Sequence, residues 1–186
     1  MNGYVLIGGR SRRMGRSKVE LFLPQTLAAA RPAFDAVYAV QRSGGRMAEG
    51  VDTIFEPAHD DEAPVFGVLC ALEHAAGRCV VMAVDYPLLT TEVLRYLAER
   101  TEGARAPLVV PRWDDRLQVL CAGYDGQALA PRLAARIAGG RLDLRGLVAE
   151  VESEIIEEGE LRARFGGEPL RNVNTPEQLP EAMRPT

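Results

Sequence analysis

The sequence predicts an α/β fold, with one mainly parallel sheet between two layers of helices in a single domain that spans residues 1–186. Short apolar runs alternate with segments of helical periodicity along the chain. The run 79–84 is continuously apolar, which is typical of a central parallel strand, and Asp85 ends it. The first apolar run, 4–7, ends in two glycines and a cationic loop. In such folds, ligands bind beyond the carboxyl ends of the strands, where this loop and Asp85 both fall.

The strands are expected at the apolar runs that end in glycine, proline or polar residues. In chain order these are 4–7, 36–40, 53–55, 79–84, 108–111, 117–122 and 151–156. The segment 113–115 is expected to join the fifth strand to the sixth. A loop is expected over 59–64, because it combines acidic residues with alanine and proline.

The helices are expected where apolar residues recur at helical spacing. They are 25–30, a stripe within 68–76, 90–100, 129–137, 144–148 and a last helix from Pro176. Pro24 is expected to exclude the residues before it from the first helix. Thr175 followed by proline is a strong helix start.

Charge is distributed unevenly along the 186 residues, whose net charge is −4. Residues 1–19 hold five cations and no acidic residue, so a cationic loop lies on an otherwise acidic protein. This pattern favours a small phosphorylated ligand, and it argues against nucleic acid, which usually needs an extended basic face. No apolar run approaches the ~18 residues that a membrane span needs, and no signal peptide is evident, so we expect a cytoplasmic protein.

Three cysteines, Cys70, Cys79 and Cys121, lie in apolar runs without a paired-cysteine motif. We therefore expect buried free thiols rather than a disulfide framework or a zinc site.

The glycine-rich loop contains Lys18, which is the only lysine among 22 basic residues. Lysine is a compact charge on a flexible stem, which suits contact with a phosphate. Gly8 and Gly9 allow the backbone to approach a ligand, and their N–H groups can cradle an anion. The spacing matches neither the Walker A loop nor the dinucleotide-binding glycine motif.

Other polar residues follow strands and leave alternatives open. Asp85 is either a ligand of Mg²⁺ or a turn residue before Pro87, and the cationic loop favours the metal. Glu56 is either a ligand contact or a solvated loop acid. Asn172 and Asn174 point to one side of an extended segment, where they either bind a polar heterocycle or organise a turn.

The two histidines, His59 and His74, have no serine or cysteine partner in a recognisable pattern, so we expect neither to be catalytic.

Four segments together resemble the motifs of the MobA-like nucleotidyltransferases, the molybdenum cofactor guanylyltransferases and their relatives. They are Leu6-Ile7-Gly8-Gly9-Arg10-Ser11-Arg12-Arg13-Met14-Gly15-Arg16-Ser17-Lys18, Pro64-Val65-Phe66-Gly67-Val68, Val84-Asp85-Tyr86-Pro87 and Asn172-Val173-Asn174-Thr175-Pro176. They occur in the family's order along nearly the whole chain.

The resemblance implies a three-layer, Rossmann-like nucleotide-diphospho-sugar transferase fold with a mixed, mainly parallel sheet. It implies transfer of GMP from GTP to molybdopterin, the molybdenum cofactor, with release of pyrophosphate. Leu6, Ile7, Gly8 and Gly9 would contact the nucleotide, Arg13 and Lys18 would neutralise its phosphates as catalytic residues, and Asp85 would hold Mg²⁺ at the α-phosphate. Asn172 and Asn174 would lie toward the pterin, and molybdoenzyme-maturation proteins are conceivable partners.

The resemblance leaves open which nucleotide base the protein binds. Gln41 stands where the family often has Asn for the base, and Glu56 stands where an Asp is usual. The alternatives are a molybdopterin cytidylyltransferase, a nucleotidyltransferase for another small phosphate, or a nucleotide-binding homologue without turnover.

Overall fold

The computed structural model describes residues 1–8 and 18–173, with Lys18 described in its backbone only. Within these residues one sheet forms, in the order β3-β2-β1-β4-β7-β5-β6, and β8 pairs with β5. The strands are β1 (Asn2–Leu6), β2 (Val37–Gln41), β3 (Asp52–Phe55), β4 (Arg78–Ala83), β5 (Leu108–Trp113), β6 (Arg116–Leu117), β7 (Cys121–Asp125) and β8 (Ser153–Ile156). The four strands β3, β2, β1 and β4 are parallel, whereas β7 is antiparallel to both β4 and β5.

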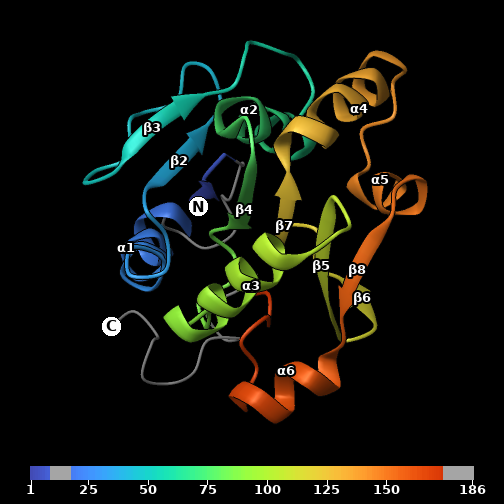
Figure 1. Ribbon diagram of the computed structural model, residues 1–186. Helices are drawn as coiled ribbons and strands as arrows, with labels where there is room; N and C mark the ends of the chain where they lie inside the picture. The colour runs from blue at the N-terminus through green and yellow to red at the C-terminus, as the bar shows by residue number, and fades with distance from the viewer. Residues whose placement is uncertain (9–17, 174–186) are drawn as a thin grey trace.

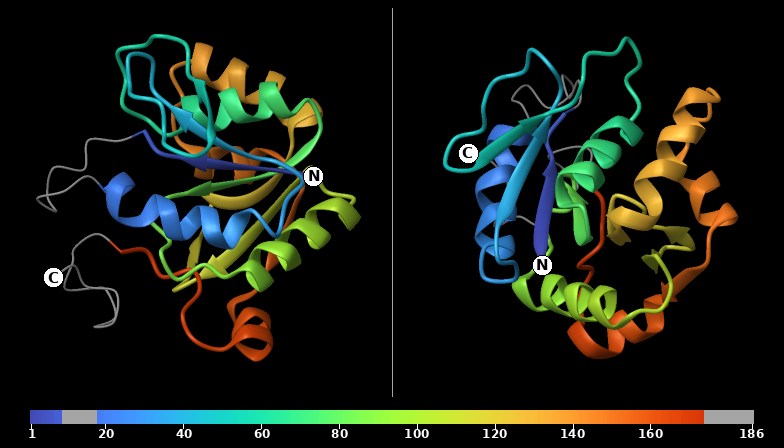
Figure 2. Two further views of the ribbon diagram at one scale, coloured as in Figure 1. Left: turned by 90° about the vertical axis from the view of Figure 1, so that its left-hand side faces the viewer. Right: turned by 45° about the horizontal axis from the view of Figure 1, so that its top comes forward.

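Helices cover both faces of the sheet. They are α1 (Lys18–Ala30), α2 (Val65–Ala75), α3 (Thr91–Gly103), α4 (Gly126–Ala138), α5 (Leu144–Glu150) and α6 (Glu158–Phe165). Residues of α1, α3 and α6 share one buried apolar cluster, and residues of α2, α4 and α5 share the other. Figure 1 and the left view of Figure 2 show the sheet between these two layers. The predicted mixed, mainly parallel α/β fold is confirmed.

The strand order reverses at β1. The chain runs from β1 outward through β2 to β3, and it then crosses by α2 to β4 on the other side of β1. The carboxyl end of β1 is therefore a topological switch point, where open α/β sheets form a ligand crevice.

The first helix is longer than the sequence predicts, because α1 begins at Lys18 and keeps Pro24 in its interior. Proline removes a backbone donor and disfavours a helix interior. Here Phe22, Leu23 and Leu27 are each at most 5% exposed against the sheet. Packing of this apolar stripe outweighs the local propensity, so the expected start at Gln25 is wrong.

The segment 117–122 is not one strand as predicted. It contributes the end of β6, a turn and the start of β7. The Gln118 side chain donates to the carbonyls of Trp113 and Arg116, at 3.0 and 3.1 Å, and the Gln118 carbonyl accepts from the Cys121 N–H at 2.9 Å. These local bonds form the turn that separates β6 from β7.

The predicted connection at 113–115 is a tight hairpin between β5 and β6. Asp114 and Asp115 take φ values of 49° and 55°, in the left-handed region that aspartate tolerates better than most residues.

The helix α6 was not expected from the sequence. Its charged residues alternate with few apolar ones, and within it only Leu161 is buried. The expected last helix from Pro176 lies outside the described residues.

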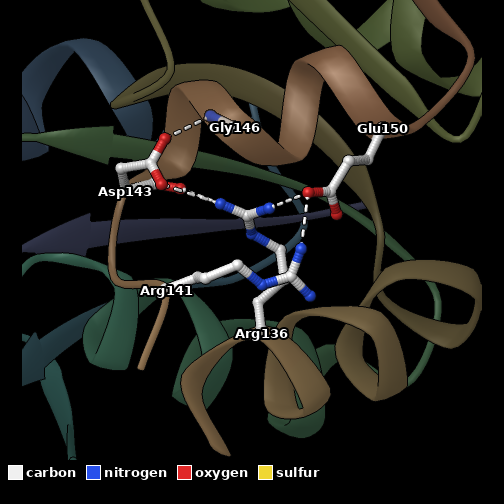
Figure 3. A network of polar contacts seen from close by, with 5 residues as sticks. All are labelled: Arg136, Arg141, Asp143, Gly146 and Glu150. Carbon is white, nitrogen blue, oxygen red and sulfur yellow. Dashed lines mark hydrogen bonds and ion pairs between the residues drawn. The ribbon is translucent and has the colours of Figure 1, made fainter. Parts of the chain in front are cut away.

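A buried guanidinium joins α4 to α5 (Figure 3). Arg136 is 2% exposed, and its Nη2 lies 2.8 Å from Oδ2 of Asp143 and 2.9 Å from the Asp143 carbonyl. Glu150 pairs with the other terminal nitrogen of Arg136 and with Arg141. The Asp143 side chain also accepts from the Gly146 N–H as the N-cap of α5.

None of the helices in the described ranges combines the length and the apolar character that a membrane crossing requires.

Candidate functional site

Backbone hydrogen bonds continue past the ends of the four parallel strands and bring their carboxyl ends side by side. The Glu56 N–H donates to the Gln41 carbonyl at 2.8 Å, the Ile7 N–H donates to the Val40 carbonyl at 2.9 Å, and the Val84 N–H donates to the Leu6 carbonyl at 3.3 Å. The residues that follow β3, β2, β1 and β4 therefore form one row along this edge of the sheet. Glu56 starts the row and Asp85 ends it, three strand spacings or roughly 14 Å apart.

Glu56 is a buried carboxylate at one end of this row. Its side chain is 8% exposed, so it is not a solvated loop acid. It lies against the first turn of α2 and the end of β1, because a Cβ at Gly67 would lie 2.8 Å from its Oε1 and a Cβ at Gly8 would lie 3.6 Å from it. Glycine at these two positions leaves the space that the carboxylate occupies. A negative charge is also favoured at a helix N-terminus.

Two residues that the sequence analysis did not assign to the site surround Glu56. The His59 Nε2 lies 2.8 Å from the Glu56 Oε2, and the His59 ring stacks on Phe66 with centroids 3.7 Å apart. Arg42, directly after β2, donates to the His59 carbonyl at 3.2 Å and lies 3.6 Å from a Glu62 carboxylate oxygen. Arg42 thus fixes the segment after β3 next to Gly8, where a Cβ would lie 3.2 Å from the Arg42 Cγ.

Gln41 lies on the opposite face of the sheet from Glu56. Gln41 is paired in register with Phe55, so the next residue, Glu56, points to the other side. The Gln41 side chain lines a cleft of about 1010 Å³ between α1 and the segment 46–50, and its Oε1 accepts from the Arg42 N–H at 3.0 Å. Other residues of this cleft are Ile7, Leu23, Leu27, Arg46 and Met47. The structure does not bring the two predicted base-pocket residues together.

The end of β1 alternates between the same two faces. Ile7 belongs to the apolar cluster on the α1 side, whereas Leu6 belongs to the cluster on the α2 side. A Cβ at Gly67 would lie 3.2 Å from the Leu6 Cδ2. Leu6 and Gly8 are therefore the predicted nucleotide contacts that lie beside Glu56.

Asp85 is half-buried after β4, and the C-terminal segment lies directly beside it. The Val173 N–H donates to the Asp85 carbonyl at 3.0 Å, which brings the exposed Asn172 to the Asp85 end of the row. The Gln25 side chain in α1 donates to the Pro87 carbonyl at 2.8 Å. Helix α1 and the segment that contains Asn172 and Val173 thus both help to position the loop that contains Asp85.

Several predicted site residues lie outside the described part of the structure. They are Gly9, Arg13, Asn174 and the side chain of Lys18.

Within the described residues, no group of three or more histidine, cysteine or acidic side chains could hold a metal ion. Asp85 is therefore not part of such a cluster within the described residues.

The negative charge of Glu56 also affects the pKa of the neighbouring Cys70 thiol. Burial, together with the charges of Glu56 and Glu73, raises the pKa of Cys70 to about 11. The thiol lies 3.6 Å from the Phe55 carbonyl. Cys70 is therefore a protonated, unreactive thiol at neutral pH.

The fold and this edge define a doubly wound α/β protein whose candidate site lies at the switch point. Comparison with known proteins gives the family: residues 3–154 match the MobA-like NTP transferase domain, and the chain belongs to that family.

Named relatives and a solved structure resemble the chain over nearly its whole length. A probable molybdenum cofactor guanylyltransferase of Mycobacterium marinum is 31% identical over 98% of this chain and 93% of its own, and that of Mycobacterium avium is 31% identical over 95% and 92%. The crystal structure of molybdopterin-guanine dinucleotide biosynthesis protein A from Archaeoglobus fulgidus has 26% identity and a TM-score of 0.82, covering 99% of this chain and 97% of that one. The family that the four motifs predicted is confirmed.

Proposed function

We propose that the protein is a molybdenum cofactor guanylyltransferase, which transfers GMP from GTP to molybdopterin and releases pyrophosphate. The observation that carries the proposal is the row at the carboxyl edge of the sheet, with Glu56 at one end, the end of β1 in the middle and Asp85 at the other end. The length of the row, roughly 14 Å, is similar to that of an extended nucleoside triphosphate. The named relatives supply the acceptor.

The base would bind at the Glu56 end. An ionised carboxylate only accepts hydrogen bonds, and guanine offers two adjacent donors, its N1–H and its exocyclic amine. Cytosine offers one amine donor beside an acceptor nitrogen. Leu6 and Gly8 would lie beneath the base, and glycine at positions 8 and 67 leaves room for the Glu56 carboxylate that would bind it. Guanine specificity rests on Glu56, because Gln41 points to the other face.

The phosphates would lie over the Gly8–Lys18 loop, where Arg13 and Lys18 would neutralise their charge. Asp85 fits a Mg²⁺ site, since this ion commonly binds through one or two carboxylates plus phosphate oxygens. A bound Mg²⁺ would withdraw charge from the phosphoryl oxygens. Asp85 therefore contributes a hard oxygen ligand at the α-phosphate end.

The acceptor would approach from the side of Asn172, and the family resemblance assigns Asn174 to the same role. The terminal phosphate oxygen of molybdopterin would attack the α-phosphorus, the bond from that phosphorus to the bridging oxygen would break, and pyrophosphate would leave. Positioning and charge stabilisation suffice for this step, so the chain needs no nucleophilic side chain.

The test is pyrophosphate release with Mg²⁺ and GTP, CTP, ATP or UTP in turn, with and without molybdenum-loaded molybdopterin. The proposal requires release with GTP and only in the presence of the pterin. Release with CTP alone would instead give a cytidylyltransferase. Nucleotide binding without any release would indicate another acceptor or a homologue that lacks turnover.

A further inference from the structure

We infer that His59 is a positioning residue for base recognition, because it orients the Glu56 carboxylate toward the nucleotide. This inference rests on the proposed binding of the base at Glu56. Nothing in the four motifs includes His59, and the sequence alone gave it no role.

The first observation is that His59 holds one of the two carboxylate oxygens. The His59 Nε2 lies 2.8 Å from the Glu56 Oε2, and the two side chains are 14% and 8% exposed. The carboxylate is thereby turned so that Oε1 lies against Gly67 and close to Gly8 at the end of β1. In the described residues no donor is hydrogen-bonded to Oε1, so this oxygen is available to a ligand.

The second observation is that the His59 ring is itself held in place. It stacks on Phe66 with centroids 3.7 Å apart and planes 18° apart, and the His59 carbonyl accepts from Arg42. The ring therefore cannot turn without losing its contact with Phe66 on α2, while the Arg42 bond holds the His59 backbone. A side chain whose ring and backbone are both held can orient its partner.

The third observation concerns the tautomer. The Nδ1 of His59 is buried and has no hydrogen-bond partner in the described structure. The neutral tautomer with its proton on Nε2 matches this environment, because Nε2 then donates to Glu56 and Nδ1 carries no proton that would need a buried acceptor. With this tautomer, Glu56 Oε2 accepts from His59 and Oε1 remains an acceptor for a ligand.

The experiment compares His59→Leu, which removes the donor, with His59→Gln, which keeps an N–H donor on a side chain of similar reach. The chain has a second histidine, His74 in the last turn of α2, whose Nδ1 lies 2.9 Å from the hydroxyl of Tyr4 in β1. His74→Leu is therefore the matched control. GTP and ITP binding is measured without acceptor, and KM and kcat are measured with it.

We expect His59→Leu to weaken GTP binding about tenfold or more, the loss that follows removal of a hydrogen bond to a charged group. The kcat at saturating GTP should stay near that of the unchanged protein. His59→Gln should restore much of the affinity, and His74→Leu should leave it unchanged. ITP lacks the exocyclic amine, so the preference for GTP over ITP should shrink in His59→Leu.

A double variant tests more directly whether His59 acts through Glu56. The double variant of Glu56→Gln and His59→Leu should bind GTP no more weakly than Glu56→Gln alone, because His59 acts through Glu56. Wild-type affinity in a folded His59→Leu, or independent and additive losses in the double variant, would overturn the inference.

If His59→Leu does not fold, the inference can still be tested on the unsubstituted protein. Nitrogen-15 NMR of the two imidazole rings should show His59 as the Nε2–H tautomer, with its signal identified by comparison with His74→Leu. An Nδ1–H tautomer would contradict the inference. If the unchanged protein binds no nucleotide, the proposed function fails; if it binds and turns over GTP while His59 is unimportant, only this inference fails.

Discussion

At the scale of single residues, the two ends of the candidate site are both carboxylates, but their surroundings differ. Glu56 is buried against glycines, a histidine and the start of α2. Asp85 is half-buried at the switch point, beside the segment that contains Asn172. The buried carboxylate is suited to recognising donors, and the more open one is suited to sharing a cation with phosphates.

The first prediction concerns Asp85, the proposed metal ligand. Asp85→Asn should lower kcat with Mg²⁺ by about 10²-fold or more, because the neutral amide binds a hard cation poorly and stabilisation of the transition-state charge is lost. Nucleotide binding in the absence of metal should change little. Steady-state kinetics and calorimetric titration with GTP measure these quantities.

The control makes the same chemical change at a remote position. Asp115→Asn replaces an exposed residue of the β5–β6 hairpin that has positive φ, a conformation that asparagine tolerates. Its activity should match that of the unchanged protein. Near-normal activity in a folded Asp85→Asn would remove Asp85 from the site.

The second prediction concerns the space next to Glu56. Gly67→Ala should raise the KM for GTP about tenfold, because the new Cβ would lie 2.8 Å from Oε1 and force the carboxylate to move away. Kinetics at varied GTP concentration check this. The control is Gly159→Ala in α6, where an added Cβ meets nothing within 4 Å. A Gly67→Ala enzyme with an unchanged KM would show that the position of Glu56 does not affect binding.

At the scale of helices and strands, the sequence predicted the central strands well, because β1 and β4 are buried on both faces and read as continuous apolar runs. It misplaced the start of α1, where burial of an apolar stripe outweighs Pro24. The sequence also predicted β6 and β7 as one strand. The side-chain hydrogen bonds of Gln118 that form the turn do not change the pattern of apolar residues, so this pattern does not reveal the turn.

The third prediction concerns the contact between α4 and α5. Asp143→Ala should lower the free energy of unfolding by about 3 kcal/mol, since it removes both an N-cap and a charged partner of the buried Arg136. Chemical denaturation measures the change. The proposed site lies at another part of the sheet, so kcat and KM should remain near normal.

A second aspartate provides the comparison for this change. Asp125 caps α4, and its charged partner Arg78 lies 3.7 Å away with a more exposed side chain. Asp125→Ala should therefore cost about 1 kcal/mol. Equal losses from the two variants would mean that the buried guanidinium contributes nothing beyond the cap.

At the scale of the whole molecule, the sequence predicted at which edge of the sheet the candidate site residues lie. It did not predict on which face of the sheet each side chain lies. The rule that ligands bind at the carboxyl ends of parallel strands placed the loop at Gly8 and Asp85 on one edge, and the family resemblance added Gln41 and Glu56. The structure places these four residues at that edge. The register of β2 with β3 then separates Gln41 from Glu56. Register depends on contacts between strands, so a single sequence does not display it.

The contribution of His59 was hidden for a related reason. Its contacts with Glu56 and Phe66 depend on how the segment after β3 folds against α2. Spacing alone shows a histidine three residues after an acid, a pattern that has no specific meaning outside a helix.

The fourth prediction concerns the packed interior. Burial raises the pKa of Cys79 and Cys121 from 9.0 to about 12, so both thiols stay protonated in the folded protein. At pH 8 they should not react with a thiol reagent until the protein unfolds, as timed assays with and without denaturant would show. Prompt labelling of either thiol in the folded protein would contradict the buried sheet.

The same shifts determine how stability depends on pH. The folded pKa lies above the unfolded value, so this contribution is complete below pH 9 and is lost as the pH rises from there toward about 12. Denaturation midpoints should therefore fall across that interval. Replacing either cysteine by alanine should reduce the fall.

The measurement that most directly tests the proposed function follows the fate of the α-phosphate. GTP labelled at the α-phosphorus or at the γ-phosphorus is incubated with the protein, Mg²⁺ and molybdenum-loaded molybdopterin. If the protein transfers GMP to molybdopterin, the α-label enters the pterin dinucleotide and the γ-label leaves as pyrophosphate. Appearance of the γ-label as inorganic phosphate, with the α-label retained in GDP, would show hydrolysis instead of nucleotidyl transfer and would contradict the account.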